Sequence, residues 1–481
     1  MLFWSVVFVL NLAAAVVIIF FERKNPAVAA AWLLVFLVLP AFGLLLYLFL
    51  GLDFPNKYKR IIKDLKKDSG YLNGILKRQL EILTSDANLQ QAPEVEQCAD
   101  MIYMNLRQSF SFFMPANAVQ VYTEGRKMFD DLFYDLSRAS SSINVEYFIF
   151  KPDSTGKAFL DILVKKAEAG VKVRLLYDMF GFLGLKKSFF SPLIAAGGQV
   201  RPFLPHLFSN LLHANYRNHR KIVVIDGKIA YTGGMNVGDE YNSRWKEDRT
   251  WRDTHLKVCG PGVYMFQTRF LMDWKLCTGK GFDIKSGRLA NYFPPIPACG
   301  RIPIQVVSSG PDADDHFIEL AYIKLIHKAA HTLYIQTPYF IPDDVFLSAI
   351  KVAAASGVDV RVMVPDKGDR AYVHYATLSY VEDLLNCGVR VYFYHGFLHA
   401  KTMVTDQLIT SVGSANLDVR SLCINFEINT FLYDAAFAEK YTGIFLEDIQ
   451  NCTEMTRELY AKRPWYRRAV ESVCRLFSPI M

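Results

Sequence analysis

Two long apolar runs open the chain. Residues 2–21 are twenty residues without a charge, and residues 27–52 are twenty-six more, separated by a polar step at residues 22–26. As a helix, each run can cross a bilayer core of about 30 Å. The chain starts apolar and continues into a second apolar run, unlike a cleaved secretory signal. Residues 1–52 are therefore predicted to form a transmembrane helical hairpin; the alternative is one span followed by a buried core helix.

Basic residues follow the second run. Residues 53–67 carry six Lys and Arg against two acidic residues, whereas the short loop carries only Arg23 and Lys24. The positive-inside rule places the more basic flank in the cytoplasm. We therefore expect a multi-pass membrane protein whose large body is cytoplasmic, joined to the hairpin by a basic juxtamembrane helical linker at 53–105.

The rest of the chain contains an internal repeat, in which four segments recur in the same order about 180 to 190 residues later. The segments are 143–150, 170–178, 196–203 and 218–226 in the first copy, and 333–340, 357–365, 387–393 and 398–406 in the second. Helical stretches such as 158–169 and 344–356 lie between them, each followed by a glycine typical of a helix end. This alternation predicts the α/β class, with two α/β/α sandwich halves at 106–295 and 296–456 related by a pseudo-twofold axis.

Both copies end in one polar pattern of identical spacing. Its members are His219, Lys221, Asp226 and Asn236 in the first copy, and His399, Lys401, Asp406, Ser414 and Asn416 in the second, where Gly234 takes the place of Ser414. Residues two apart on a strand point to one face, so each His and its Lys should reach the same spot. One such pair would mean little, but two copies with matching flanks make a chance match remote.

Two imidazoles, two ammonium groups and two amides at an axis suit phosphodiester chemistry. The Lys and Asn side chains can hold the non-bridging oxygens, one His can attack phosphorus, and the other can protonate the departing alkoxide. The lysines supply the positive charge that Mg²⁺ supplies elsewhere, so we expect no metal and no cofactor. The eight cysteines form no C-x-x-C pair, which fits a reducing compartment without a zinc site or a disulfide framework.

A nucleophilic imidazole needs its second nitrogen held, normally by a carboxylate. Asp253 and Glu427 follow the two motifs in strand-like segments. We expect Asp253 to orient His219 and Glu427 to orient His399, with Glu247 as the alternative partner of His219.

The two HxKxxxxD motifs are those of the phospholipase D superfamily. The stretches 215–221, 233–241 and 413–421, with the N-terminal residues 23–26 and 31–34, resemble the bacterial cardiolipin synthases of that superfamily. The resemblance covers essentially the whole chain. Gly234 departs from the superfamily pattern, in which serine is common at this position.

The resemblance implies transfer of a phosphatidyl group from one phosphatidylglycerol to the terminal hydroxyl of another, with release of glycerol. By analogy His219 is the nucleophile and His399 the acid and base, although both histidines have the same supports. The resemblance also places Lys221, Asp226, Lys401 and Asp406 among the catalytic residues. The implied partners are phosphatidylglycerol and cardiolipin in the anionic inner membrane of a bacterium. The alternatives are a phospholipase D or a phosphatidylserine synthase with the same site. An inactive lipid-binding scaffold should have lost a His or Lys, and both sets are present.

Charge and composition refine this picture. The net charge of +7 is concentrated in residues 53–67 and 457–481, each with six basic and two acidic residues, so the body has no basic excess that predicts a nucleic-acid partner. Residues 457–481 are predicted to be a basic amphipathic segment at the membrane, or else a packed terminal helix. Segments 180–192 and 205–212 predict either a lipid-contacting rim or part of the core. The sequence sets no oligomeric state and is compatible with a homodimer.

Overall fold

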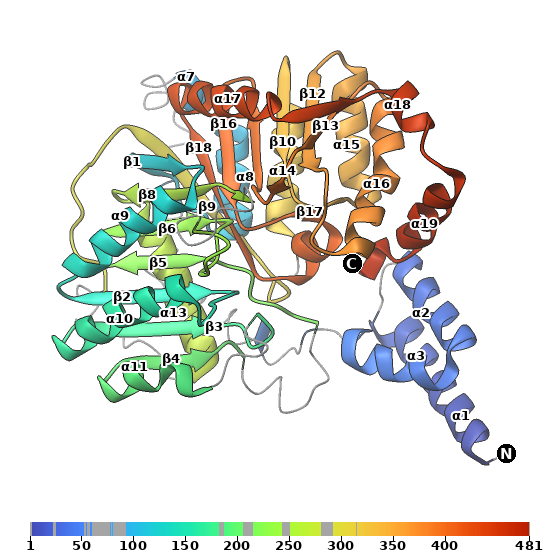
Figure 1. The fold of residues 1–481 in the computed structure, drawn as a ribbon, viewed down its shortest axis with the longest axis horizontal. Coiled ribbons are helices and arrows are strands. Elements are labelled where there is room, and N and C mark those ends of the chain that lie inside the picture. The colour runs from blue at the N-terminus through green and yellow to red at the C-terminus, as the bar shows by residue number, and fades with distance from the viewer. Residues whose placement is uncertain are drawn as a thin grey trace.

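A computed structural model of the chain describes residues 2–22, 26–51, 54, 58–59, 77, 79, 93–181, 187–204, 215–242, 251–279, 292–313 and 315–480. It shows a large α/β body with a group of apolar helices beside it (Figure 1). Glu247, segment 205–212 and most of the linker at 53–105 lie outside the described residues.

One fifteen-stranded sheet runs through the body in the order β19-β13-β12-β10-β15-β16-β18-β9-β1-β8-β6-β5-β2-β3-β4. In the first half the strands are β1 (Met114–Tyr122), β2 (Ser142–Tyr147), β3 (Lys172–Tyr177), β4 (Gln199–Pro202), β5 (Ile222–Ile225), β6 (Ile229–Gly233) and β8 (His255–Cys259). In the second they are β9 (Ile302–Ser309), β10 (Thr332–Gln336), β12 (Asp359–Pro365), β13 (Arg390–Tyr394), β15 (Thr402–Thr405), β16 (Ile409–Gly413), β18 (Glu427–Tyr433) and β19 (Cys452–Met455).

The strand order confirms the two predicted halves. Outward from the antiparallel contact between β1 and β9, the first half reads β1-β8-β6-β5-β2-β3-β4 and the second reads β9-β18-β16-β15-β10-β12-β13. Each position therefore has a counterpart across a pseudo-twofold axis at the joint. Two short parallel pairs lie outside the large sheet: β7 (Trp251–Arg252) with β14 (Phe397–Leu398), which connects the halves, and β11 (Phe340–Ile341) with β17 (Leu417–Asp418).

Helices cover both faces of the sheet, as an α/β/α sandwich requires. One face carries α9 (Gly125–Arg138), α10 (Ser154–Glu168) and α11 (Ser191–Ala195) in the first half, and α14 (Phe317–Lys328), α15 (Asp344–Ala355) and α16 (Ala371–Asn386) in the second, where α8 (Ala99–Ser109) joins them. The other face carries α13 (Val263–Thr278) and α17 (Ala435–Ile449), whose apolar side chains share a core drawn from both halves. The side chains of Asp153, Asp343 and Asp434 cap the first turns of α10, α15 and α17.

The N-terminal helices differ from the expected pair of spans. Of the described residues, one helix, Leu2–Glu22, is long and apolar enough to cross a membrane; it combines α1 (Leu2–Val16) with a π-helical turn (Val17–Glu22). The second run breaks into α2 (Pro26–Val38) and α3 (Pro40–Leu46), followed by a π-helical turn (Tyr47–Gly51).

The two parts of the second run lie antiparallel. The rings of Trp32 and Tyr47 are 5.4 Å apart, whereas a straight helix would separate these residues by about 22 Å. Pro40 interrupts the helix because it has no backbone N–H to donate to the preceding turn. Gly43 lets the returning segment approach closely, because a Cβ there would come within 2.7 Å of the Val35 carbonyl oxygen. Tyr47 donates to Glu22 at 2.8 Å, so the run returns to the end from which it started.

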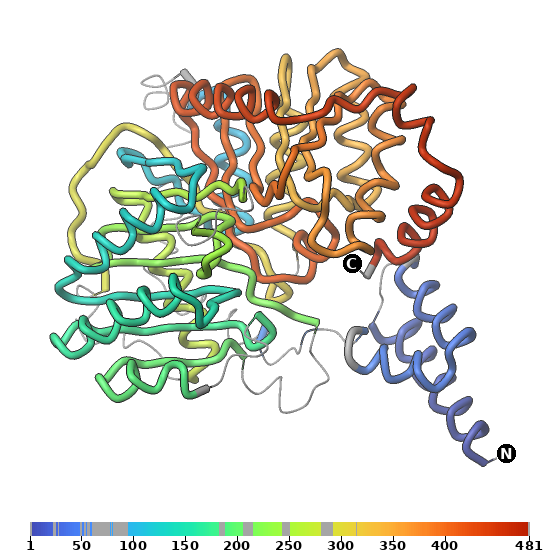
Figure 2. The backbone as a smooth tube through the Cα atoms, in the orientation of Figure 1, coloured from blue at the N-terminus to red at the C-terminus, as the bar shows by residue number. Residues whose placement is uncertain are grey.

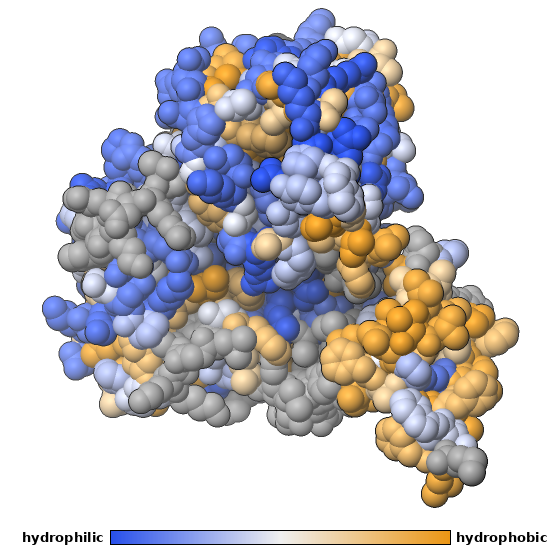
Figure 3. All heavy atoms as spheres, turned by 45° about the vertical axis from the view of Figure 1, so that its right-hand side comes forward, coloured by the Kyte–Doolittle hydropathy of each residue, from blue (hydrophilic) through white to orange (hydrophobic). Residues whose placement is uncertain are grey.

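The C-terminal segment forms α18 (Arg457–Ala461) and α19 (Trp465–Leu476). One face of α19 packs on α16, where Arg475 pairs with Asp383 at 2.7 Å, while Trp465 and Leu476 remain 80% and 73% exposed. Figure 2 shows this segment beside the N-terminal helices. Apolar side chains gather over those helices, next to a largely hydrophilic body (Figure 3). Of the two expectations for segment 180–192, a lipid rim or part of the core, the second holds for Phe190, which is buried against Phe150 and Tyr177.

Candidate active site

Both motif histidines lie where one half is joined to the other. His219 and Lys221 come just before β5, and His399 and Lys401 just before β15. The backbone N–H of His219 donates to the Phe426 carbonyl at 2.9 Å, and that of His399 donates to the Arg252 carbonyl at 2.7 Å. Each histidine is thus fixed by a backbone bond to the opposite half, as the pseudo-twofold symmetry requires.

The orienting carboxylates also come from the opposite half. Nδ1 of His219 lies 2.9 Å from Oε1 of Glu427, and Nδ1 of His399 lies 2.6 Å from Oδ2 of Asp253. The sequence-based choice of these two carboxylates agrees with the geometry, but the predicted pairing within each half was wrong. The physical reason is that β7, β14 and the bridge from Asn218 to Phe426 bring the strand ends of the two halves together. Each neutral imidazole donates from Nδ1 to its carboxylate and keeps the lone pair of Nε2.

Gly234 and Ser414 fit the carboxylates that they face. Ser414 Oγ donates to Oε2 of Glu427, which ties the longer acid to the strand. At position 234 an added Cβ would meet Oδ1 of Asp253 at 2.0 Å. The departure from the superfamily pattern therefore makes room for the shorter acid in the first half.

The two motif lysines lie deep in the site. Lys221 and Lys401 are buried, and each Nζ donates to the carbonyl of the histidine two residues before it, at 2.6 Å for Lys221. Burial lowers the pKa of Lys221 to about 7 and that of Lys401 to about 8, although Glu427 and Asp253 oppose the effect. The empty site holds ammonium groups that an anion would stabilise.

Both histidines are neutral near pH 7 in the empty site. Burial lowers the pKa of His219, with Glu427 opposing, and burial together with Lys401 lowers the pKa of His399 to about 4. Lys401 also acts on His219, and Lys221 on His399, so the two motifs share one electrostatic environment. Two neutral imidazoles close to two lysines can attack or bind a phosphodiester without an unfavourable proton loss.

The two motif aspartates stand apart from this cluster. Asp226 and Asp406 lie beyond β5 and β15, about 16 Å along the strand from Lys221 and Lys401. Asp226 accepts the N–H groups of residues 140–142 at 2.7–2.9 Å, and Asp406 accepts those of residues 330–332 at 2.6–2.8 Å. Both have positive φ values, 53° and 52°. Their predicted catalytic role is corrected to a structural one: each closes a turn and fixes the start of the neighbouring strand.

The two asparagines differ in their contacts. Oδ1 of Asn236 accepts the N–H of Ile149 at 3.2 Å, and its Nδ2 donates to the hydroxyl of Tyr241 at 3.1 Å. Asn416 is buried, and its Oδ1 has no hydrogen-bond partner within the described part of the chain. The side-chain amide of Asn236 uses both its oxygen and its nitrogen in hydrogen bonds within the protein, whereas Asn416 retains hydrogen-bonding capacity for a ligand.

Two buried arginines, missed by the sequence analysis, hold the backbone of the orienting carboxylates. Arg220 donates to the carbonyl of Glu427 at 3.2 Å and pairs with Asp273 at 2.8 Å. Arg252 donates to the carbonyl of Asp253 at 2.6 Å and binds Asp448 through Nε at 2.9 Å. Because Arg220 lies between His219 and Lys221, strand alternation predicts that its side chain points away from the site and into the core.

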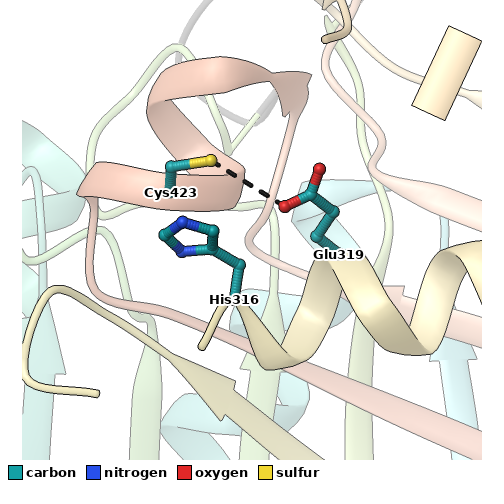
Figure 4. Close-up of side chains that lie close together, drawn as sticks. All are labelled: His316, Glu319 and Cys423. Atoms are coloured by element: carbon teal, nitrogen blue, oxygen red, sulfur yellow. Dashed lines mark hydrogen bonds between the residues drawn. The ribbon is translucent and has the colours of Figure 1, made fainter. Parts of the chain in front are cut away.

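A separate cluster of His316, Glu319 and Cys423 lies beside α14 (Figure 4). Sγ of Cys423 is 3.9 Å from Oε2 of Glu319, and all three offer ligand atoms within 4.8 Å of one another. Burial and the neighbouring Asp343 raise the pKa of Glu319 to about 8, and burial with Glu319 raises the pKa of the Cys423 thiol. The acid and the thiol are therefore protonated near neutral pH, which makes this a neutral hydrogen-bonded cluster.

Comparison with known proteins agrees with this geometry. Residues 132–254 and 322–449 match the family model described as "Cardiolipin synthase, PLD-like domain", and residues 9–51 match "Phospholipase_D-nuclease N-terminal". The chain is 43% identical over 479 residues to the major cardiolipin synthase ClsA of Bacillus subtilis, covering 99% of this chain and 98% of that protein. It is 42% identical to the cardiolipin synthase of Staphylococcus aureus strain Mu50, covering 98% and 95%.

A solved structure shares the fold. The phosphatidylserine synthase of Haemophilus influenzae superposes with a TM-score of 0.59 at 14% identity, covering 76% of this chain and 97% of that one. This likeness concerns the fold alone, while the family matches extend over the repeat and the N-terminal helices. The chain belongs to the family of cardiolipin synthases built on phospholipase D-like domains.

Proposed function

We propose that the protein is a phosphatidyltransferase that converts two phosphatidylglycerol molecules into cardiolipin and glycerol through a phosphohistidine. The observation that carries this proposal is the pair of neutral imidazoles, each held at Nδ1 by a carboxylate of the opposite half, in one electrostatic environment with two buried lysines. The family relationship supports the choice of lipid substrate.

In the first step Nε2 of His219 attacks the donor phosphorus, and the bond from phosphorus to the glycerol oxygen breaks. His399 gives that oxygen a proton, so glycerol leaves as a neutral molecule. Burial and Lys401 keep the pKa of His399 near 4 in the empty site, and the negative phosphodiester raises it by favouring the charged imidazolium. The substrate itself thus brings the acid into its protonated form.

In the second step His399 takes the proton from the terminal hydroxyl of a second phosphatidylglycerol. The alkoxide oxygen bonds to phosphorus while the bond to Nε2 of His219 breaks, which restores the free enzyme. One phosphodiester replaces another, so the cycle balances without a nucleotide, a metal or another cofactor. The lysines carry the charge of the transition state in place of a metal ion.

We further propose that the apolar N-terminal helices and the exposed face of α19 anchor the body to the cytoplasmic side of the bacterial cell membrane. Helix Leu2–Glu22 supports insertion, and the basic residues at 53–67 and 457–481 support a position against anionic lipid. The mouth of the site would then receive both lipids from one leaflet.

Product analysis tests the reaction. The full chain in vesicles of phosphatidylglycerol should form cardiolipin and glycerol in equal amounts, without any added cofactor. Formation of phosphatidic acid without cardiolipin would instead identify a phospholipase D. A phosphatidylserine synthase would be identified by a product that forms only when serine is supplied.

A further inference from the structure

The mouth of the site is not symmetric, although the catalytic groups are. Arg217 precedes His219 by two residues, and the matching position before His399 is Phe397. Arg420 follows Asn416 by four residues, and the matching position after Asn236 is Glu240, which pairs with Lys151 at 2.6 Å. One side of the mouth therefore has two guanidinium groups where the other has an aromatic ring and a neutralised acid.

Arg217 lies directly outward from the reacting histidine. The N–H of Phe426 donates to the carbonyl of Arg217 at 2.8 Å, and the N–H of His219 donates to the carbonyl of Phe426. In this extended segment the two residues share a face and are about 7 Å apart. Exposure grows outward along the segment, since Lys221 and His219 are buried and Arg217 is half-buried.

Arg420 brings a second cation to the same place from the other half. Its Nη1 donates to Oδ1 of Asn215 at 2.6 Å, in the segment that leads to Arg217. Burial lowers the pKa of Arg217 to about 10. The charge of Asp178 opposes this shift and the charge of Arg420 adds to it, so the two guanidinium groups interact electrostatically. Both remain charged at neutral pH.

The protein leaves one donor of this arginine pair without a partner in its described part. Nη1 of Arg217 is buried without a hydrogen-bond partner among the described residues, and its guanidinium stacks 3.3 Å from the ring centre of Phe180. Asp178 and Asp418 oppose the two cations in part, and their carboxylates also accept backbone N–H groups, of Asn218 at 2.8 Å and of Ser421 at 2.6 Å. Two adjacent guanidinium groups, one of them with a buried donor that has no partner among the described residues, form a site for an anion.

We propose that Arg217 and Arg420 bind the phosphodiester of the acceptor lipid. This proposal rests on the proposed function: cardiolipin carries two phosphodiesters joined by one glycerol, so its synthesis requires a second anion position one glycerol away from the lysines. Arg217 and Arg420 provide that position at the mouth. A water molecule or free glycerol lacks the second phosphodiester and gains nothing there, so the pair favours cardiolipin formation over hydrolysis.

Two soluble acceptors that differ only in this group test the proposal. With phosphatidylglycerol as donor and the full chain in vesicles, transfer to isotope-labelled glycerol, which gives labelled phosphatidylglycerol, is compared with transfer to labelled glycerophosphoglycerol, the deacylated form of the acceptor. The ratio of the two kcat/KM values is the readout. In the unaltered protein it should favour glycerophosphoglycerol, and Arg217→Gln or Arg420→Gln should lower it roughly tenfold to a hundredfold, the usual effect of losing a charged hydrogen bond. Arg217→Lys should retain part of the preference.

Arg390→Gln is the matched control, because Arg390 pairs with Glu454 at 2.8 Å near the start of β13 and should leave the ratio unchanged. The proposal is overturned if the Gln variants keep the ratio, or if both acceptors lose rate in parallel, as a structural role would produce. Failure of the proposed function has another signature: the unaltered protein would then form phosphatidic acid and no cardiolipin from phosphatidylglycerol alone.

Discussion

His219 and His399 have the same motif and the same kind of carboxylate, yet their surroundings differ. One ring, Phe148, lies 5.0 Å from the ring of His219, and the cations Arg217 and Arg420 stand outside it. His399 is surrounded by the rings of Trp251, Phe397 and Tyr241 at 5.2, 5.8 and 6.3 Å. The comparison shows that the reacting groups are alike in the two halves while their surroundings differ: aromatic rings surround one histidine, and a pair of cations lies beside the other.

Removing either histidine should have the largest effect and separate their roles. His219→Ala and His399→Ala should each lower cardiolipin synthesis by at least about a thousandfold, because each removes a group that bonds to reacting atoms. With labelled donor lipid, only His399→Ala should retain label on the protein after rapid denaturation. Label on His219→Ala instead would exchange the assigned roles.

The crossed carboxylates should come next. Glu427→Gln and Asp253→Asn remove the charge that orients one imidazole, and each should lower kcat about a hundredfold to ten-thousandfold. Because Glu427 contacts His219, Glu427→Gln should slow formation of the labelled intermediate in single-turnover experiments. Asp253→Asn should slow its transfer to the acceptor more strongly. The reverse pattern would contradict the contacts between the halves.

The lowered pKa values of the two motif lysines predict that the affinity of the site for an anion falls as the pH rises. The pKa of Lys221 is about 7 and that of Lys401 about 8 in the empty site, so both lose their protons as the pH rises from 6 to 9. Binding of dimethyl phosphate, whose charge is constant over this range, should weaken by up to about tenfold per pH unit for each proton taken up. Calorimetry in two buffers measures the uptake. Lys221→Met should remove the lower step, and an affinity independent of pH would contradict the lowered pKa values.

Exchanging the small residues behind the carboxylates should have a smaller effect that differs between the halves. Gly234→Ser places its Cβ against Asp253 and should lower kcat roughly tenfold to a hundredfold, since overpacking costs about 1–3 kcal/mol. Ser414→Gly removes one hydrogen bond to Glu427 and should cost roughly tenfold or less. Equal effects of the two variants would remove this distinction between the halves.

The motif aspartates should affect activity least. Asp226→Asn and Asp406→Asn weaken the hydrogen bonds that start β2 and β10, so each should lower the free energy of unfolding by about 1–3 kcal/mol. Denaturant titration measures that change, and kcat at a temperature where both variants are folded should stay within about threefold. A loss as large as that of the histidine variants would restore a catalytic role.

The sequence predicted the fold and the reacting groups because both depend on local patterns that occur twice. Strand-length runs and the spacing of His and Lys can be seen in one copy and checked in the other. The pairing of Asp253 with His399 cannot be seen within one copy, because it depends on which strand ends meet across the joint between the halves. The same holds for Asp226, whose place in the motif gave no sign that its partners are backbone N–H groups 84 to 86 residues away.

The second apolar run shows another limit of pattern analysis. Its length is that of a spanning helix, but length does not reveal whether the run continues or returns. Pro40 and Gly43 were visible, and their combined effect depends on Trp32 and Tyr47 meeting across the turn. The direction of the second half of the run is set by packing between side chains that are far apart in the sequence, and the hydrophobic periodicity does not reveal such packing.

The exchange of carboxylates across the axis also bears on how such a chain can arise. Neither half by itself contains a complete catalytic unit, because its histidine would lack its carboxylate. Two copies of a single half, paired about the same axis, would supply each other with both. Fusion of two such copies into one chain would preserve both catalytic units from the start. The residues around each histidine could then diverge, as Arg217 and Phe397 at matching positions have done.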